Sequence, residues 1–200
     1  MTNYRPVALT SVICQVLEQI VSSSILEHVE TFGLLNPNQH GFTQKRSCVT
    51  QLINVLHAWC TILDKNRPPC VDAAFLDMSK AFDKMPHHIL LSTLSAQFNV
   101  TGTLWKWIKS FLVGRIQRVI FQGSSAPWVD ATSGVPQGSC LGHLLFNLFI
   151  NDISLPLSSK SVMFADDILM FRTVQSPNDE ERFQTDLQLL HEWDELKQMA

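Results

Sequence analysis

Two adjacent aspartates, Asp166 and Asp167, lie between the apolar runs 162–164 and 168–171. Short apolar runs on both sides of a polar pair predict a β-hairpin with the acids at its tip. Two like charges repel and resist desolvation, so packing alone gives no reason for them. A divalent cation removes that penalty, because it bridges carboxylate oxygens and lowers their pKa values. A solvated turn is the alternative, since Asp is a favoured turn residue.

A third acid, Asp77, ends the apolar run 73–76. A short continuous apolar run predicts a buried strand. A carboxylate at the end of such a strand is where an enzyme built on a sheet exposes a ligand. A helix N-cap uses the same residue type, so this interpretation of Asp77 stays open.

The segment 133–139 is rich in glycine and proline and leads into a helical apolar face. A glycine loop before a helix lets another molecule approach closely and offers N–H groups to a phosphate. It lacks the GxxxxGK[ST] form of a P-loop, so an ordinary strand-to-helix turn explains it equally well. The adjacent cations Lys45 and Arg46, taken alone, predict a solvated loop.

The elements that must position these residues follow from apolar periodicity. Helix-period patterns, with caps or breakers at their ends, predict the following helices: 13–33, 52–63, 87–98, 104–114, 141–148 and from 177 onward. Thr10 or Ser11 would cap the first helix. The predicted apolar faces include Ile13 and Ile20 in the first helix, Leu52 and Leu56 in the second, and Leu190 and Trp193 in the last. Residues 115–121 and 128–132 alternate like paired strands around a turn at 123–125.

Composition excludes several classes of protein. The chain has 200 residues, 46% of them hydrophobic, and a net charge of −3, so it can bury a core and carries no general basic field. Its five cysteines show no CxxC spacing, which disfavours structural zinc and disulfides and favours a reducing, intracellular compartment. No apolar run approaches the roughly 20 residues of a membrane span, and no targeting signal is visible.

Five blocks, taken together, resemble the reverse transcriptase domain of a non-LTR (LINE-type) retrotransposon. They are NYRPVALTSV at 3–12, NQHGFTQKRSC at 38–48, FLDMSKAFDKMPH at 75–87, SGVPQGSCLG at 133–142 and FADD at 164–167. They occur in the order of that family and at its approximate spacing, over nearly the whole chain.

The resemblance implies an α+β fold, the fingers and palm of a right-hand polymerase. An antiparallel palm sheet would carry the FADD hairpin and pack on helices. Residues 1–70 are expected to be mainly fingers, and residues 71–200 mainly palm with inserted fingers segments. The thumb is expected to be absent from this stretch, and it and an endonuclease domain would belong to the full-length polyprotein.

The resemblance also implies an RNA-directed DNA polymerase, a nucleotidyltransferase that adds dNTPs to a primer 3′-OH. Its partners would be an RNA template and a DNA primer or target, with no membrane, and only the family implies a nuclear location. Asp77, Asp166 and Asp167 would be the catalytic triad around two Mg²⁺ ions, with Mn²⁺ as a possible substitute. Because successive strand residues point to opposite faces, we expect Asp77 and Asp166 to be the core ligands.

The same resemblance implies a nucleotide-binding set. Phe82 would lie under the incoming sugar and exclude a ribose 2′-hydroxyl, although a core phenylalanine is the alternative. The loop Pro136-Gln137-Gly138 would position template and nucleotide. Lys45 and Arg46 would meet the triphosphate, and Arg5 belongs to the preceding block.

Three residues depart from the family pattern. Thr43 stands where many members have arginine, and Lys197 where many have a second tryptophan. His143 replaces a proline at a predicted helix start, which loosens that start because proline is pre-organised there.

Three alternatives accompany the polymerase hypothesis. A truncated, inactive relic would act at most as a nucleic-acid-binding or interaction module. A group II intron-type reverse transcriptase shares the metal site, but the second and fourth blocks look more LINE-like. An unrelated metal-dependent hydrolase explains the paired acids and none of the other blocks.

Overall fold

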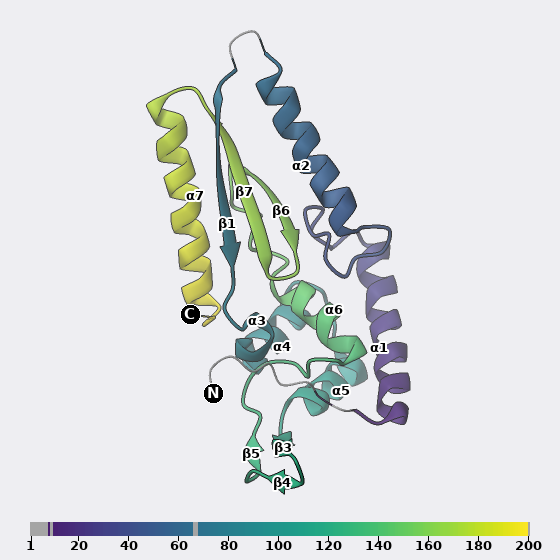
Figure 1. Ribbon diagram of the computed structural model, residues 1–200. Helices are drawn as coiled ribbons and strands as arrows, with labels where there is room; N and C mark the ends of the chain where they lie inside the picture. The colour runs from purple at the N-terminus through teal and green to yellow at the C-terminus, as the bar shows by residue number, and fades with distance from the viewer. Residues whose placement is uncertain (1–7, 9, 66–67, 200) are drawn as a thin grey trace. The chain divides into compact units, whose positions relative to one another are not determined.

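A computed structural model describes residue 8 and residues 10–65 and 68–199. The chain forms two compact units, whose elements are labelled in Figure 1. The helical unit combines the chain up to Leu34 with 80–149 and Met199, and the sheet unit combines 35–79 with 150–198. The division into fingers and palm stays a prediction, since each unit draws on both predicted ranges. No helix in the described part of the chain is long and apolar enough to cross a membrane.

The sheet unit is built on a three-stranded antiparallel sheet with β7 at its centre. In spatial order its strands are β1 (Cys70–Asp77), β7 (Asp167–Val174) and β6 (Lys160–Phe164). Helices α2 (Cys48–Leu63) and α7 (Pro177–Leu196) flank this sheet (Figure 1). Val55 and Trp59 of α2 pack with Leu169 and Phe171, whereas Asp186 of α7 contacts Arg172. Because strand residues alternate, the two helices cover opposite faces.

The predicted hairpin around the paired acids is confirmed, with β6 and β7 as its strands. Phe164 pairs with Asp167, so Ala165 and Asp166 alone form the turn. Ala165 has φ +54°, a left-handed conformation that glycine adopts more readily than alanine. The tip of the hairpin is therefore held in an unfavourable backbone conformation by its surroundings.

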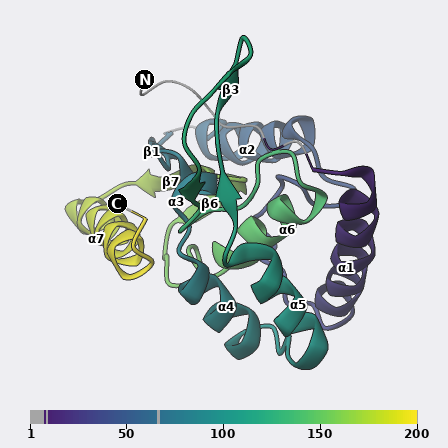
Figure 2. The same cartoon turned by 90° about the horizontal axis from the view of Figure 1, so that it is seen from below.

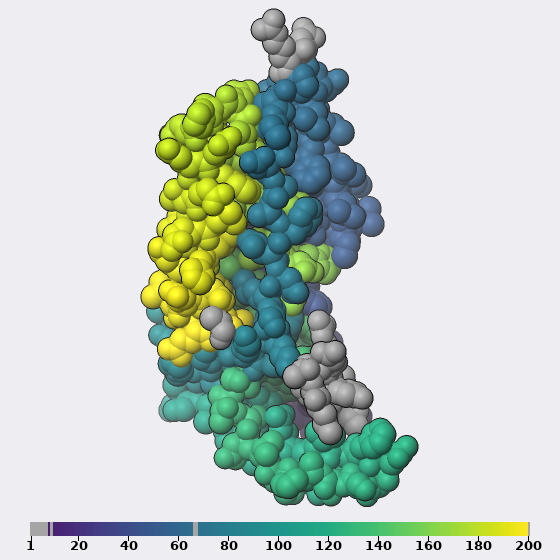
Figure 3. Space-filling view, turned by 60° about the vertical axis from the view of Figure 1, so that its left-hand side comes forward, coloured from purple at the N-terminus to yellow at the C-terminus, as the bar shows by residue number. Residues whose placement is uncertain are grey.

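Residues 73–76 form a strand, as predicted, but the strand is not buried. They lie in β1, but among the described strands β1 pairs only with β7, and Phe75 is 77% exposed. Figure 3 shows the β1 surface open between α7 and α2. Burial was wrongly predicted because a short apolar run looks the same in an edge strand as in a central one.

Helix α7 begins at Pro177, as predicted, whereas α2 begins at Cys48, four residues before the predicted start at 52. Ser47 and Thr50 form a capping box at α2, and Ser176 and Asp179 form another at α7, with Pro177 in its first turn. In α7 the buried positions include the predicted Leu190 and Trp193. In α2 the predicted apolar stripe is instead mostly exposed, because the helix packs through the neighbouring face.

The helical unit surrounds α6, whose side chains are almost all buried. Its helices are α1 (Val12–Thr31), α3 (Ala81–Lys84), α4 (His87–Ala96), α5 (Gly102–Leu112) and α6 (Cys140–Phe149). Both α1 and α4 contact α6, and Figure 2 shows α4 and α5 side by side. All the predicted helices of this unit are confirmed, and α3 was not predicted.

Helix α1 begins as predicted, because the Ser11 hydroxyl accepts a hydrogen bond of 3.3 Å from Cys14 N. Its predicted apolar face is exposed at Ile13 and Ile20. The buried positions are Glu18, Ile25 and Val29 instead. The periodicity therefore identified the helix correctly but not the face that packs.

The predicted hairpin at 115–132 is present as two short ladders, and Figures 1 and 2 show it extending away from α5. The ladders pair β2 (Ile116–Gln117) with β5 (Val129–Asp130) and β3 (Ile120–Phe121) with β4 (Ser124–Ser125). The turn is at Gln122 and Gly123, both with positive φ, and not at 123–125 as predicted.

Candidate active site

Asp77 and Asp167 are direct partners in the antiparallel register of β1 and β7. Residues directly opposite in such a pair point to the same face, with Cβ atoms about 4.5–5.5 Å apart. Both side chains are exposed. The fold therefore gathers two of the three predicted acids at one end of the sheet.

Asp166 precedes Asp167 and occupies the second turn position, where it is half-buried. The expected alternation requires both acids to belong to a strand, but only Asp167 does. Strand alternation therefore does not separate their roles, and the preference for Asp166 over Asp167 as a core ligand stays a prediction. Asp77 does not act as an N-cap, because Lys80 occupies that position of α3.

The carboxylates fit a hard divalent cation whose coordination shell is completed by water and substrate. Within the described residues, no group of three or more His, Cys, Asp or Glu side chains could by itself hold a metal ion, as an all-protein cage would. Mg²⁺ seldom uses such a cage, since it keeps several waters and binds one or two carboxylates plus substrate phosphates. An exposed pair of opposed acids with a third beside it has the donor chemistry for that arrangement.

The predicted cations Lys45 and Arg46 lie on the sheet unit and differ in environment. Lys45 is exposed. Arg46 donates from Nη1 to the carbonyl oxygens of Pro37 and of Gln39, the latter at 2.8 Å. Burial, and then the charge of Arg46, lower the pKa of the nearby His40 below its ordinary value. Arg46 thus fixes the path of its own loop, and its role toward a triphosphate stays a prediction.

Phe82 lies on the helical unit and is half-buried. Its ring stacks on Phe146 with centroids 4.2 Å apart and meets His143 edge-on at 5.7 Å. Burial lowers the pKa of His143, although a hydrogen bond with the backbone of Ser139 opposes the shift. His143 is thus an aromatic neighbour of Phe82 within α6, and the helix begins at Cys140 without proline.

The glycine loop packs on the segment that contains Phe82. Val135 N donates to Phe82 O at 2.9 Å, and Gln137 Nε2 donates to Asp83 Oδ1 at 3.0 Å. Pro136 is buried, Gln137 is half-buried and Gly138 is exposed with φ +95°. The structure therefore brings Phe82 and the predicted loop residues together within one unit.

Gly134 makes this packing possible. It has φ +73°, and a Cβ there would lie 2.5 Å from Phe82 O and 2.6 Å from Asp83 O. Its carbonyl accepts from Arg115 Nη2 at 3.1 Å and lies 2.8 Å from His87 Nε2. Burial is the largest influence on His87 and lowers its pKa, which favours the neutral ring. Only glycine fits where the loop meets the Phe82 segment.

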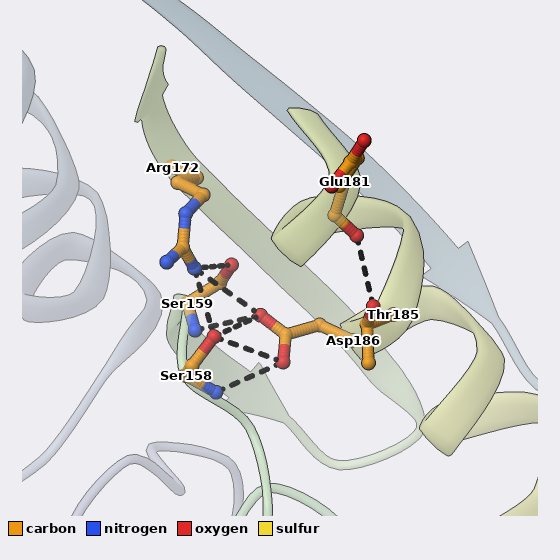
Figure 4. A network of polar contacts seen from close by, with 6 residues as sticks. All are labelled: Ser158, Ser159, Arg172, Glu181, Thr185 and Asp186. Atoms are coloured by element: carbon orange, nitrogen blue, oxygen red, sulfur yellow. Dashed lines mark hydrogen bonds and ion pairs between the residues drawn. The ribbon is translucent and has the colours of Figure 1, made fainter. Parts of the chain in front are cut away.

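Two groups of polar contacts had no sequence signal. The buried amide of Gln39 contacts the FADD turn at Ala165. The second group joins Arg172, Ser158 and Ser159 to Asp186, which is 2% exposed (Figure 4). Burial opposes ionisation of Asp186, but hydrogen bonds from the two serines outweigh it and hold its pKa below the ordinary value. The remaining predicted residue, Arg5, lies outside the described residues.

Several known proteins are similar to this chain in sequence. Among the most similar relatives, a probable RNA-directed DNA polymerase from transposon X-element of Drosophila melanogaster is 33% identical over 175 residues. That match covers 83% of this chain and 18% of the relative. The RNA-directed DNA polymerase from mobile element jockey of Drosophila funebris is 33% identical over 153 residues, covering 76% of this chain and 16% of the relative. The chain thus spans less than a fifth of the length of these two relatives.

Solved telomerase structures share the fold. Telomerase from Candida albicans, in complex with the TWJ fragment of telomeric RNA, superposes with a TM-score of 0.65 at 13% identity. It covers 90% of this chain and 33% of that one. Apo telomerase from Candida tropicalis, truncated from its C-terminal domain, gives 0.61 at 11% identity, covering 86% of this chain and 36% of that one. The predicted polymerase fold with an antiparallel sheet is thereby confirmed.

The family model described as "Reverse transcriptase (RNA-dependent DNA polymerase)" matches residues 1–198. The match covers all five sequence blocks. The two Drosophila relatives are RNA-directed DNA polymerases of a transposon and of a mobile element, in agreement with the retrotransposon family that the blocks predicted. This chain therefore belongs to the reverse transcriptase (RNA-dependent DNA polymerase) family.

Proposed function

We propose that this chain is the polymerase portion of a LINE-type retrotransposon protein and copies RNA into DNA. Its substrates would be dNTPs, an RNA template and a DNA primer or target, and its place of action the nucleus. The primer 3′-oxygen forms a bond to the α-phosphorus of the dNTP and loses its proton. The bond from that phosphorus to pyrophosphate breaks, and pyrophosphate leaves.

The direct opposition of Asp77 and Asp167, with Asp166 beside them, is the observation that carries this proposal. These three acids would hold two Mg²⁺ ions, with Mn²⁺ able to replace them. When bound, such a pair stabilises both the attacking oxygen and the leaving pyrophosphate of an in-line transfer. Without cations the opposed acids only repel each other, so their placement favours binding over a structural role.

The helical unit would hold the nucleotide. The ring of Phe82, supported by Phe146, would lie under the sugar and exclude a 2′-hydroxyl. Gln137, fixed to Asp83, would keep the Pro136–Gly138 loop against the nucleotide and template. The exposed Lys45 would contact the phosphates as a point charge, and Arg46 and Arg5 would contact them as bidentate donors.

Residues 1–70 would then be mainly fingers and 71–200 mainly palm. A thumb and an endonuclease domain would belong to a full-length polyprotein, and the two relatives are several times longer than this chain. Contacts with the template–primer duplex would be shared with those parts. A longer version of the protein is therefore needed beside the chain in any activity test.

Primer extension on an RNA template, with dNTPs and Mg²⁺, tests the proposal. The chain and a version that includes the predicted thumb are compared with their Asp77→Asn, Asp166→Asn and Asp167→Asn variants. Asp64→Asn, an exposed aspartate of the sheet unit, is the matched control. We expect Asp64→Asn to retain primer extension. Asp77→Asn should lower its rate by about a hundred- to a thousandfold, the usual loss when one group that stabilises transition-state charge is removed.

Two outcomes would contradict the proposal. Extension by Asp77→Asn at the wild-type rate would remove the metal assignment. Failure of both lengths of the wild-type protein, folded by circular dichroism, would favour an inactive relic.

A further inference from the structure

Residues 38–41 run alongside the last residues of β6 and reach the FADD turn. Met163 N donates to Asn38 O at 2.9 Å, and His40 N donates to Met163 O at 2.8 Å. Gly41 then lies directly against the turn, since a Cβ on it would be 2.3 Å from Ala165 N. Residues 38–41 therefore pack directly against the FADD turn.

Gln39 links this segment to the turn through both ends of its side-chain amide. Its Oε1 accepts from Ala165 N at 3.0 Å and from Gly41 N at 2.8 Å. Its Nε2 donates to Ala165 O at 3.4 Å. Gln39 is 5% exposed and Ala165 is 4% exposed, so water does not replace these bonds. A buried N–H left without its acceptor costs about 1–3 kcal/mol.

The turn needs this support because of its own conformation. Ala165 has φ +54°, and a non-glycine residue in that region costs about 1–2 kcal/mol. Such a conformation persists only when its surroundings determine it. Gln39 bonds both backbone polar groups of Ala165, so it determines the direction in which the chain enters Asp166.

The backbone of Gln39 is itself fixed. Its carbonyl accepts from Arg46 Nη1 at 2.8 Å, and Arg46 also donates to Pro37 O. The amide of Gln39 is neutral, so it holds the turn without adding a charge beside Asp166 and Asp167. A carboxylate at this position would increase the repulsion among the acids.

We propose that Gln39 is a positioning residue for the metal-binding carboxylates of Asp166 and Asp167. It sets the FADD turn, and thereby the separation of those carboxylates from Asp77, without touching metal or substrate. This role rests on the proposed function of the three acids. Supporting groups of this kind, when removed, typically weaken metal binding about 10–100-fold.

Mn²⁺ binding to the intact chain, followed by the loss of the free-ion electron paramagnetic resonance signal, is the readout. Gln39→Met keeps the length of the side chain and removes its hydrogen bonds. Asn36→Leu is the matched control, because Asn36 is also 5% exposed and its side chain bonds Asn151 O at 2.8 Å, Ser154 Oγ at 2.7 Å and Asn38 N at 2.9 Å. Asn36 therefore anchors the same segment as Gln39 but does not bond Ala165. Urea unfolding of each variant measures the loss of stability separately.

We expect both variants to lose comparable stability, because each removes a buried amide with several bonds. Only Gln39→Met should weaken Mn²⁺ binding, by about tenfold or more, while Asn36→Leu stays within about twofold of wild type. If Gln39→Met does not fold, Gln39→Asn takes its place, because its shorter side chain cannot reach the turn and it adds no charge beside the acids.

Three results would overturn the inference. Wild-type Mn²⁺ affinity in Gln39→Met, or in Gln39→Asn where that replaces it, would show that the turn is set without Gln39. Equal losses of affinity in Gln39→Met and Asn36→Leu would reduce Gln39 to a stabilising residue. If the wild type binds no Mn²⁺, or if Asp167→Asn binds it as tightly as the wild type does, the proposed metal site itself is wrong. The failure of the proposed function is thereby distinguished from the failure of the role of Gln39.

Discussion

Asp77 and Asp167 oppose each other across the β1–β7 strand pair, two negative side chains in direct cross-strand register. Cross-strand partners of like charge destabilise a sheet, whereas hydrophobic or oppositely charged partners stabilise it. The other pairs of this register include apolar ones, such as Phe75 opposite Leu169, and an oppositely charged one, Asp72 opposite Arg172. The sheet is therefore least favourable at the end where the acids meet.

Removing one of the opposed charges should stabilise the metal-free protein. We expect Asp167→Asn to raise the free energy of unfolding by about 0.2–1 kcal/mol in EDTA, the usual size of a cross-strand effect. In excess Mg²⁺ the order should reverse, since only the wild type gains stability from bound cation. Urea unfolding under both conditions measures this, with Asp64→Asn as the control. A less stable Asp167→Asn in EDTA would contradict the account.

Replacing Phe82 should change the choice of sugar. Phe82→Ala leaves space beside Phe146 where the ring now stacks, so a ribonucleotide would fit. We expect the ratio of rNTP to dNTP incorporation to rise by about tenfold or more, a difference of about 1.4 kcal/mol in the barrier. Single-nucleotide incorporation in the longer version of the protein measures the ratio. Phe98→Leu, at another buried phenylalanine of the same unit, should lower stability and leave the ratio unchanged.

Alanine at Gly134 should disrupt the helical unit. Gly134 and Gly114 have nearly equal φ, +73° and +75°, but a Cβ meets nothing within 4 Å at Gly114 and overlaps Phe82 O at Gly134. The backbone cost of about 1–2 kcal/mol is therefore common to both. Gly134→Ala should lower the free energy of unfolding by about 1–3 kcal/mol more than Gly114→Ala does, because the overlap forces the loop away from Phe82. Thermal unfolding compares the two, and equal losses would show that the close approach is unimportant.

Because of the buried Asp186, the free energy of unfolding should vary with pH in the acidic range. Its pKa is held below the ordinary value in the folded protein, so its contribution is fully present above the unfolded pKa of about 3.9. That contribution is lost as pH falls through the lower, folded pKa. We expect Asp186→Asn to cost about 3 kcal/mol near pH 7, as for other broken buried pairs. Urea unfolding across pH should show the difference shrinking toward acid, whereas a difference independent of pH would exclude the ionised carboxylate.

The sequence by itself determined the elements and the chemical groups. Helix periods, caps and breakers depend on residues near each other in the chain, so the helices, the FADD hairpin and the capping residue Ser11 were predictable. The five blocks determined the family, because their order and spacing form a pattern that no single motif carries. The same blocks predicted Asp77, Asp166 and Asp167 as the metal-binding acids.

Only the tertiary structure decided which faces pack and which residues meet. Ile13 and Leu52 lie on apolar stripes yet are exposed, and Phe75 lies on an open edge, because burial depends on neighbours distant in sequence. Gln39 and Ala165 are 126 residues apart, and Arg172 and Asp186 meet only when α7 folds onto β7. Hydrogen-bond geometry of this kind leaves no periodic pattern in the sequence, so the support of the FADD turn by Gln39 could be seen only in the folded protein.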